Sequence, residues 1–307
     1  MKIPKVSIII PTYQRDEILC NTIQYALNQD FEDYEILIID QTENHSQETY
    51  QFFKTLPPKV KIIHFLPASL PGARNHGISV AKGEIIIMID DDVILESNFI
   101  QHHLDSYYGD KIDCVAGKIR EAKKYRVKAC PINFNSDFIK WLSPSSFYSQ
   151  YKKEAFRVPG GNFSIRKKVI FDVGPFDENF LYTAWGEEYD FSLRLKNKGY
   201  RIVYNPKAEI FHLNYNKGGC NRRDRFNYNT IYSHSHNMSY LVEKNNLNRV
   251  FYIYLIWYVY KRVFFKKDYI SLKGLVFITK GAFFFAKGLW DGFLKGSKHS
   301  GVLAKLS

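Results

Sequence analysis

Cysteine is scarce in this chain of 307 residues, and its four cysteines are far apart. Cys20, Cys114, Cys130 and Cys220 form no C-x-x-C pair, so their spacing indicates neither a disulfide framework nor a zinc site. Free thiols are typical of a reducing compartment. We therefore expect the protein to work in the cytoplasm.

Long apolar runs are missing as well. No stretch of about 18 uncharged apolar residues occurs, which is the length that a helix needs to span a bilayer. The nearest candidate, residues 250–260, is too short by itself. After Lys2 and Lys5 the apolar run ends at Ile10, so a signal peptide is not expected either.

The sequence also lacks a glycine-rich phosphate loop. The segment PTYQRDE, which follows the first apolar run, contains neither G-x-G-x-x-G nor G-x-x-x-x-G-K-[ST]. This weighs against a dinucleotide enzyme and against a P-loop NTPase. Phosphate groups would have to be held by a metal ion and by arginine.

Acidic residues become rare after residue 220. Residues 221–307 carry 15 Lys and Arg against 4 Asp and Glu, whereas residues 1–220 carry 28 against 27. The same segment holds 19 of the 50 aromatic residues. Lysine interspersed with bulky apolar side chains is typical of helices that lie on an anionic membrane surface. We predict a catalytic domain of residues 1–220 and a basic, aromatic, helical region of residues 221–307.

Four β-branched apolar runs stand out in the first ninety residues. They cover residues 5–10, 34–40, 60–66 and 84–90, and segments of helix length separate them at 15–29, 45–55 and 71–82. This alternation predicts an α/β fold with a mostly parallel central sheet and helices on both faces. Ligands bind beyond the carboxyl ends of such strands, so Asp40 and Asp90–Asp92 are expected to share one cleft.

The stretch GEIIIMIDDDVIL (83–95) places three aspartates directly after an apolar run. Carboxylates in that position repel one another unless a positive charge lies beside them. Mg²⁺ and Mn²⁺ prefer carboxylate oxygens, and Asp90 and Asp92 form a D-x-D that suits such an ion. The alternative is a solvated turn or the cap of a helix over residues 96–108.

Two other features leave similar alternatives open. Glu187 and Glu188 lie at the predicted start of a helix over residues 185–200. Acids in that position serve as a general base or only as partners of the helix dipole. His212 follows a strand and is either a metal ligand or a structural histidine.

The middle of the chain is less regular. Residues 121–157 contain clusters of Lys, Tyr, Ser and Pro, which predict a loop-rich insertion. The sequence GGNFSI (160–165) is typical of a turn that enters a strand. Pro206 is expected to split residues 200–213 into two short strands.

The order of these motifs is more specific than any one of them. VSIIIPTYQR, YEILIIDQT, LPGARNHGISVAKGEIIIMIDDDV, PGGNFSIRKKVIFDVGPFDENF and WGEEYDFSLRLKNKGYRI follow one another, with a histidine after the last. In this order, over about residues 5–215, they resemble the family 2 glycosyltransferases. The resemblance implies a Rossmann-like GT-A fold and an inverting, nucleotide-sugar-dependent enzyme of the bacterial surface-polysaccharide type.

The resemblance also implies roles for the residues that match the family's motifs. Matched to the nucleotide-sugar site are Pro11, Thr12, Tyr13, Arg15, Asp40, Arg74, Asn75, Asp90 and Asp91. Matched to the site for Mn²⁺ or Mg²⁺ are Asp92, Asp90 and His212, and matched to the acceptor side are Gly161, Asn162 and Trp185. Glu188 stands at the position of the catalytic base, with Glu187 as the alternative.

Two positions depart from the family's pattern. Gln41 stands where a second acidic residue is common. Glu188 stands where the base is usually aspartate. Because glutamate is longer by one methylene group, geometry must decide between Glu187 and Glu188.

Together these features predict a metal-dependent inverting glycosyltransferase. It would move a sugar from a nucleotide-diphosphate donor, with UDP-sugar favoured, to a hydroxyl of a glycan or lipid-linked acceptor in cell-surface polysaccharide or glycolipid assembly. We expect it to be peripheral on the cytoplasmic face of the inner membrane, where its C-terminal region meets anionic lipid. The alternatives are a nucleotidyltransferase acting on a sugar phosphate and a non-catalytic protein that binds nucleic acid or membrane. No nucleic-acid motif is visible, and a homo-oligomer is left open.

Overall fold

The structure, a computed structural model, describes residues 5–108, 111–121, 149–219, 228–247, 252 and 272–299. Most of the predicted insertion at 121–157 and of the apolar run at 250–260 therefore lies outside the described residues. The elements in chain order are β1 (Val6–Thr12), α1 (Glu17–Leu27), β2 (Tyr34–Asp40), α2 (Gln47–Lys54), β3 (Val60–His64), α3 (Leu70–Val80), β4 (Ile85–Ile89), β5 (Val93–Leu95), α4 (Phe99–Leu104), the 3-10 helix η1 (Asp105–Tyr107), β6 (Cys114–Glu121), β7 (Lys153–Glu154), β8 (Asn162–Arg166), α6 (Lys167–Val173), α7 (Glu187–Asn197), β9 (Ile202–His212), α8 (Tyr228–Lys244) and α10 (Leu272–His299).

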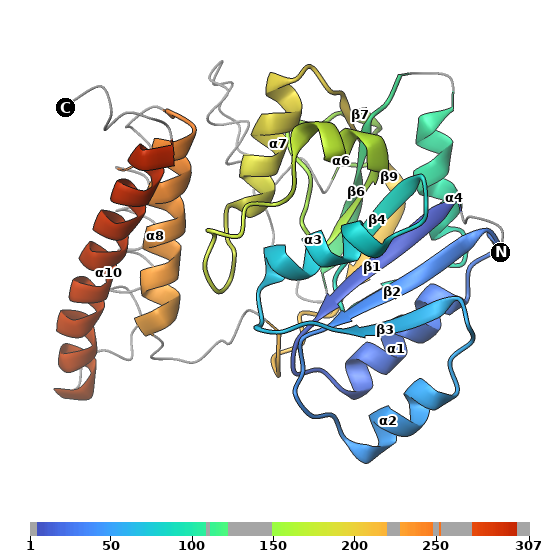
Figure 1. The fold of residues 1–307 in the computed structure, drawn as a ribbon, viewed down its shortest axis with the longest axis horizontal. Helices are drawn as coiled ribbons and strands as arrows, with labels where there is room; N and C mark the ends of the chain where they lie inside the picture. Colours follow the sequence, from blue (N-terminus) through green and yellow to red (C-terminus); the bar gives the residue numbers. More distant parts are fainter. Residues whose placement is uncertain are drawn as a thin grey trace. The chain divides into compact units, whose positions relative to one another are not determined.

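The described strands form one nine-stranded sheet in the order β3-β2-β1-β4-β8-β6-β9-β5, with β7 paired to β9 (Figure 1). The four apolar runs are β1 to β4, they are mutually parallel, and α1, α2 and α3 lie between them in the chain as predicted. Beyond β4 the sheet is mixed, because β8 runs antiparallel to both of its neighbours while β6 and β9 are parallel.

Helices cover both faces of the sheet, which confirms the predicted α/β architecture (Figure 1). Successive side chains of a strand point to opposite faces. Ile8 and Ile10 of β1 therefore pack with Leu19 of α1 in one core, whereas Ile9 packs with Ile78 of α3 in the other. Each buried isoleucine contributes about 1.5–3 kcal/mol to the free energy of unfolding, which is why runs without a polar face form these central strands.

The prediction that Pro206 ends a strand is wrong, because β9 continues through it. Strand β6 pairs with β9 up to Asn205 and resumes at Glu209, so residues 206–208 form a bulge. A proline has no N–H group to donate to the ladder, and the bulge places it where no such bond is needed.

The described residues divide into two compact units. The first comprises those within Met1–Ala68, Gly72–Phe176 and Phe191–Gly219, and the second those within Ser69–Pro71, Asp177–Asp190 and Cys220–Ser307. The second unit thus joins the segment 177–190 to the C-terminal helices. A domain boundary at residue 220 stays a prediction.

The described residues of the C-terminal region lie mainly in helices α8 and α10, as predicted, and these two helices pack closely against each other. Gly288, Gly292 and Gly296 lie on one face of α10 because they recur every fourth residue. A Cβ atom at Gly292 would collide with the backbone of His236 in α8, so only glycine permits this approach. Among the described helices, none combines the length and the apolar character that crossing a membrane requires.

Candidate active site

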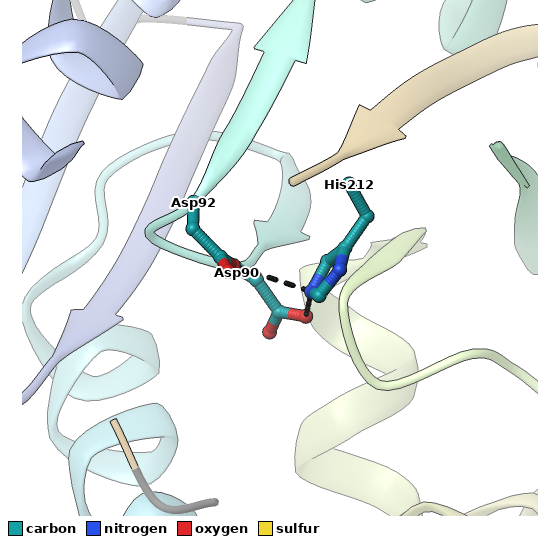
Figure 2. A group of neighbouring side chains, drawn as sticks. All are labelled: Asp90, Asp92 and His212. Carbon is teal, nitrogen blue, oxygen red and sulfur yellow. Dashed lines mark ion pairs between the residues drawn. The ribbon is translucent and has the colours of Figure 1, made fainter. Parts of the chain in front are cut away.

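Asp90, Asp92 and His212 converge at the carboxyl end of β4 (Figure 2). His212 Nε2 lies 3.3 Å from Asp90 Oδ2 and 3.2 Å from Asp92 Oδ1. The sheet brings them together, since β5 pairs antiparallel with β9 and places Val93 opposite His212. One ligand atom from each residue lies within 4.8 Å of the others. Two carboxylates and an imidazole are a donor set that fits a divalent cation, and the carboxylate oxygens suit both Mn²⁺ and Mg²⁺.

His212 supplies positive charge between the two carboxylates. Burial lowers the pKa of its imidazole, but Asp90 and Asp92 outweigh burial and raise that pKa to about 9. The same contact holds the pKa of Asp90 below its usual value against the effect of burial. A metal ligand must be unprotonated, so metal binding here releases a proton and is favoured as the pH rises.

Asp91 faces away from this group of three. Its Oδ2 accepts a hydrogen bond of 2.7 Å from Thr12 Oγ1, and its Oδ1 lies 3.4 Å from Arg15 Nε. Burial raises the pKa of Asp91 to about 7, although Arg15 acts in the opposite direction. Successive side chains of the triplet therefore point to opposite sides, with Asp90 and Asp92 on one side and Asp91 on the other.

Arg15 is a buried internal link in this structure. Its Nη2 lies 3.7 Å from Asp92 Oδ2, and its Nη1 donates to the carbonyl oxygens of Tyr215 and Lys217. The N–H of Tyr215 donates in turn to Asp92 Oδ2 at 2.8 Å. Arg15 thus joins the acidic turn to the segment that follows His212, and a contact between Arg15 and a nucleotide sugar stays a prediction.

Asp40 lies at the same edge of the sheet, because β1 and β2 pair in register with Thr12 opposite Asp40. Asp40 is buried, and its two oxygens accept from His45 Nε2 and from the N–H of Thr42, both at 2.9 Å. Burial raises the pKa of Asp40, but these two donors outweigh it and hold the pKa below its usual value. His45 Nδ1 also lies 2.9 Å from Asp16 Oδ1, so one imidazole connects two carboxylates.

Arg74 and Asn75 lie in the first turns of α3 and bond to two other segments of the chain, at Gly160 and at Phe176. Arg74 Nη2 donates to the carbonyl of Gly160 at 2.9 Å, and its guanidinium lies 5.4 Å from the ring centre of Phe176. Asn75 donates to the carbonyl of Phe176 at 2.9 Å and accepts from its N–H at 2.8 Å. Both side chains therefore already form bonds within the protein, and their contacts with the donor stay a prediction.

Gly161 and Asn162, predicted on the acceptor side, have different surroundings. Gly161 lies directly against the Asp90 carboxylate, with no room for a Cβ atom. The amide of Asn162 is buried and donates to the carbonyls of Lys118 and Ala208, while its oxygen meets His103 Nε2. These bonds support a packing role for the Asn162 side chain.

Pro11 lies in β1 and Tyr13 directly after it, both in the first unit, whereas Trp185, Glu187 and Glu188 lie in the second unit, around the start of α7. Glu187 is buried, with 1% of its surface exposed, whereas Glu188 is half-buried. Trp185 stacks on His234 of α8 with ring centres 5.9 Å apart.

A sequence model described as glycosyl transferase family 2 matches residues 7–173, more than half of the chain. The chain belongs to this family. The match covers β1 to α6 and with them Asp90, Asp92 and Gly161, but it ends before Glu187, Glu188 and His212.

Relatives of this family 2 chain include YdaM of Bacillus subtilis, a probable glycosyltransferase. It is 24% identical over 216 residues, which are 67% of this chain and 50% of that protein. The GalNAc(5)-diNAcBac-PP-undecaprenol beta-1,3-glucosyltransferase of Campylobacter jejuni is 27% identical over 212 residues, 65% of this chain and 64% of that protein. The matched parts are thus less than two thirds of either relative.

The fold resembles that in the crystal structure of GalNAc-T7 with UDP, GalNAc and Mn²⁺. The TM-score is 0.58 and the identity 16%, over 80% of this chain and 51% of that one. The predicted GT-A fold is thereby confirmed for this family 2 member.

Several residues that shape the site of this family 2 chain were missed at the sequence level. They are His45, His103, Tyr215 and Lys217. An isolated histidine gives no signal of its partners, and Tyr215 and Lys217 contribute backbone groups that any residue offers. The short spacing between Asp40 and His45 was the one available hint.

The close contact between Gly161 and Asp90 yields a prediction. In Gly161→Ala the new Cβ displaces the Asp90 carboxylate from His212, so the affinity for Mn²⁺ is expected to fall about 10–100-fold. Calorimetric titration with Mn²⁺ measures this. The matched control is Gly160→Ala, whose Cβ would meet only the end of the Arg74 side chain, at 2.9 Å. Equal Mn²⁺ affinity in Gly161→Ala and the wild type would contradict the role of Asp90.

Proposed function

We propose that this protein transfers a sugar from a nucleoside-diphosphate donor to a hydroxyl group of an acceptor, with the help of a divalent cation. The observation that carries the proposal is the convergence of Asp90, Asp92 and His212 at a strand end in a family 2 chain. The presence of UDP and Mn²⁺ in the GalNAc-T7 structure supports a metal-held nucleoside diphosphate, and a UDP-sugar stays the favoured donor.

On the donor side, Asp90, Asp92 and His212 would hold Mn²⁺ or Mg²⁺. A bound metal ion neutralises negative charge on a departing diphosphate. Arg74 adds a second positive charge for the phosphates. Pro11, Thr12, Tyr13 and Asp40 would contact the nucleoside, with Asp40 kept ionised by His45, and Asn75 would lie near the sugar. Asp91 and Arg15 act indirectly, because their contacts hold the acidic turn (Asp90–Asp92) and the segment after His212 in place.

On the acceptor side, Glu188 would take the proton from the attacking hydroxyl, with Glu187 as the alternative. One carboxylate base and direct displacement at the anomeric carbon lead to inversion, as in inverting glycosidases. The half-buried Glu188 is better placed to meet solvent-borne substrate than the buried Glu187. Trp185 and Gly161 would complete the proposed acceptor side, and Asn162 would support it through its buried hydrogen bonds.

The acceptor class is a glycan or a lipid-linked saccharide in cell-envelope assembly. The name of the Campylobacter relative, which contains an undecaprenol-linked saccharide, supports this. The position would be peripheral at the inner membrane, with the C-terminal region on anionic lipid. Exposed Phe283 and Trp290 on α10, a helix with five lysines and one aspartate, support it.

Metal-dependent donor binding is tested by thermal shift with nucleotide sugars and Mn²⁺. A ligand at about 100 times its Kd stabilises the native state by about 2.7 kcal/mol, which should raise Tm by roughly 5 °C. In Asp92→Ala the rise that depends on Mn²⁺ is expected to vanish. Asp172→Ala, which removes an exposed carboxylate of α6, should keep it. A full Mn²⁺-dependent shift in Asp92→Ala would exclude the proposed metal site.

The roles of Glu187 and Glu188 are distinguished by replacing each residue with glutamine. Glu188→Gln should lower kcat about 10²–10⁴-fold, since a general base contributes that much, while the donor-induced thermal shift is unchanged. Turnover assays with a nucleotide sugar and a saccharide acceptor measure both variants. If only Glu187→Gln shows this loss, Glu187 is the base, and if neither does, the base lies elsewhere.

Membrane binding is tested with vesicles of phosphatidylcholine, with and without phosphatidylglycerol. Removing two exposed aromatics in Phe283→Ser/Trp290→Ser should weaken binding to the anionic vesicles about tenfold, because it reduces the buried apolar area. Phe171→Ser of α6, a similarly exposed phenylalanine in the first unit, is the control. Sedimentation with vesicles measures the binding of each variant. Equal binding of all variants would show that the face of α10 with Phe283 and Trp290 does not bind the membrane.

A further inference from the structure

The segment 177–190 of the second unit has an unusual backbone. Tyr182 and Ala184 have φ values of 48° and 49°, and Gly186 has a φ of 105°. Left-handed conformations are unfavourable for residues with a Cβ atom. Strained residues of this kind persist only where the surrounding structure holds them, and they gather at functional sites.

Helix α8 fixes the backbone at the point where the strained residues begin. Asn237, which is fully buried, accepts a hydrogen bond of 2.8 Å from the N–H of Leu181 and donates one of 3.0 Å to its carbonyl. Both backbone groups of the residue before Tyr182 are therefore bound by one side chain. His234 of the same helix stacks on Trp185.

A single ammonium group joins the two ends of the segment. Lys244 Nζ, near the end of α8, lies 2.6 Å from Asp177 Oδ2 and 2.8 Å from Asp190 Oδ1. The hydroxyl of Tyr240 donates to the same Asp177 oxygen at 2.6 Å, and the amide of Asn245 donates to Asp190 at 3.2 Å.

This ionic group is largely excluded from solvent. The side chains of Lys244, Asp177 and Asp190 are exposed by 11%, 10% and 0%. Burial raises the pKa of Asp177, but Lys244 and Tyr240 outweigh it and lower that pKa to about 2. Removing the Lys244 ammonium would leave two buried carboxylates without the positive charge that they share, which strongly favours rearrangement of the segment.

The held segment carries Trp185, Glu187 and Glu188. We propose that Lys244 is a positioning residue for sugar transfer: with Tyr240 and Asn237 it fixes the strained segment and so aims the carboxylate base. The inference rests on the proposed function, because it takes the base from that segment. Lys244 lies far beyond residue 173, where the match to the family ends. Helix α8 therefore contributes to the acceptor half of the reaction.

The test compares full-length Lys244→Met with the wild type and with Lys287→Met. Lys287 is the matched control, since it pairs with Asp291 on the exposed side of α10. We expect Lys244→Met to lower kcat at least tenfold, with the KM for the donor and its Mn²⁺-dependent thermal shift changed less than twofold. Lys244→Arg should recover part of kcat. Tyr240→Phe, which removes one hydroxyl and keeps the ring, should lower kcat about threefold and decides the question if Lys244→Met does not fold.

A second measurement does not depend on activity. Amide hydrogen exchange in residues 178–190 should become at least tenfold faster in Lys244→Met or Tyr240→Phe, and stay unchanged in Lys287→Met. Wild-type kcat and exchange in folded Lys244→Met, or in Tyr240→Phe if the former does not fold, would overturn the proposal. So would equal losses of kcat and donor affinity, which indicate a general structural role. A wild type without transferase activity refutes the proposed function instead, and the exchange result then decides whether Lys244 holds the segment.

Discussion

The structure around β4 depends on balancing buried negative charge. Three aspartates follow an apolar strand, and two of them are almost fully buried. Arg15 compensates Asp91 from within the protein, and His212 compensates Asp90 and Asp92 from the adjoining strand β9. Because the two cations come from opposite ends of the first unit's sequence, charge balance itself fastens the segment after His212 to the turn after β1. The most exposed member of that arrangement is Asp90, whose side chain is 36% exposed.

The parallel half of the sheet could be predicted from the sequence. Strands β1, β2 and β4 are buried along their whole length, so their sequences are mostly apolar, and the helices between the strands follow from chain length. The mixed half could not, because β8, β6 and β9 pair across large separations in sequence. Local patterns do not encode such a choice of partner. The family resemblance identified the fold despite this, since it rests on the order of the motifs.

The site shows the same division between local and distant information. The proximity of Asp90, Asp92 and His212 was expected from the resemblance, and alternation along the chain separates Asp91 from its neighbours. The buried bonds of Arg15 and Asn162 were not predictable, because both residue types suit ligand contact and internal packing equally well. Lys244 is a stronger example. It meets Asp177 and Asp190 from more than fifty residues away, and a basic segment of that composition indicated a surface rather than a buried ion pair.

The bulge at Pro206 has a consequence for how chains of this kind can change in length. Gly117 and Lys118 are adjacent in β6, but their partners in β9, Asn205 and Glu209, are separated by three residues. In a regular strand a shift of one residue turns every following side chain to the opposite face, whereas a bulge takes up extra residues and leaves the pairs on either side of it in register. A change of length within residues 206–208 can therefore leave His212 opposite Val93 and facing the aspartates. This irregularity, distant from the chemistry, is thus a place where insertions and deletions can be tolerated in evolution.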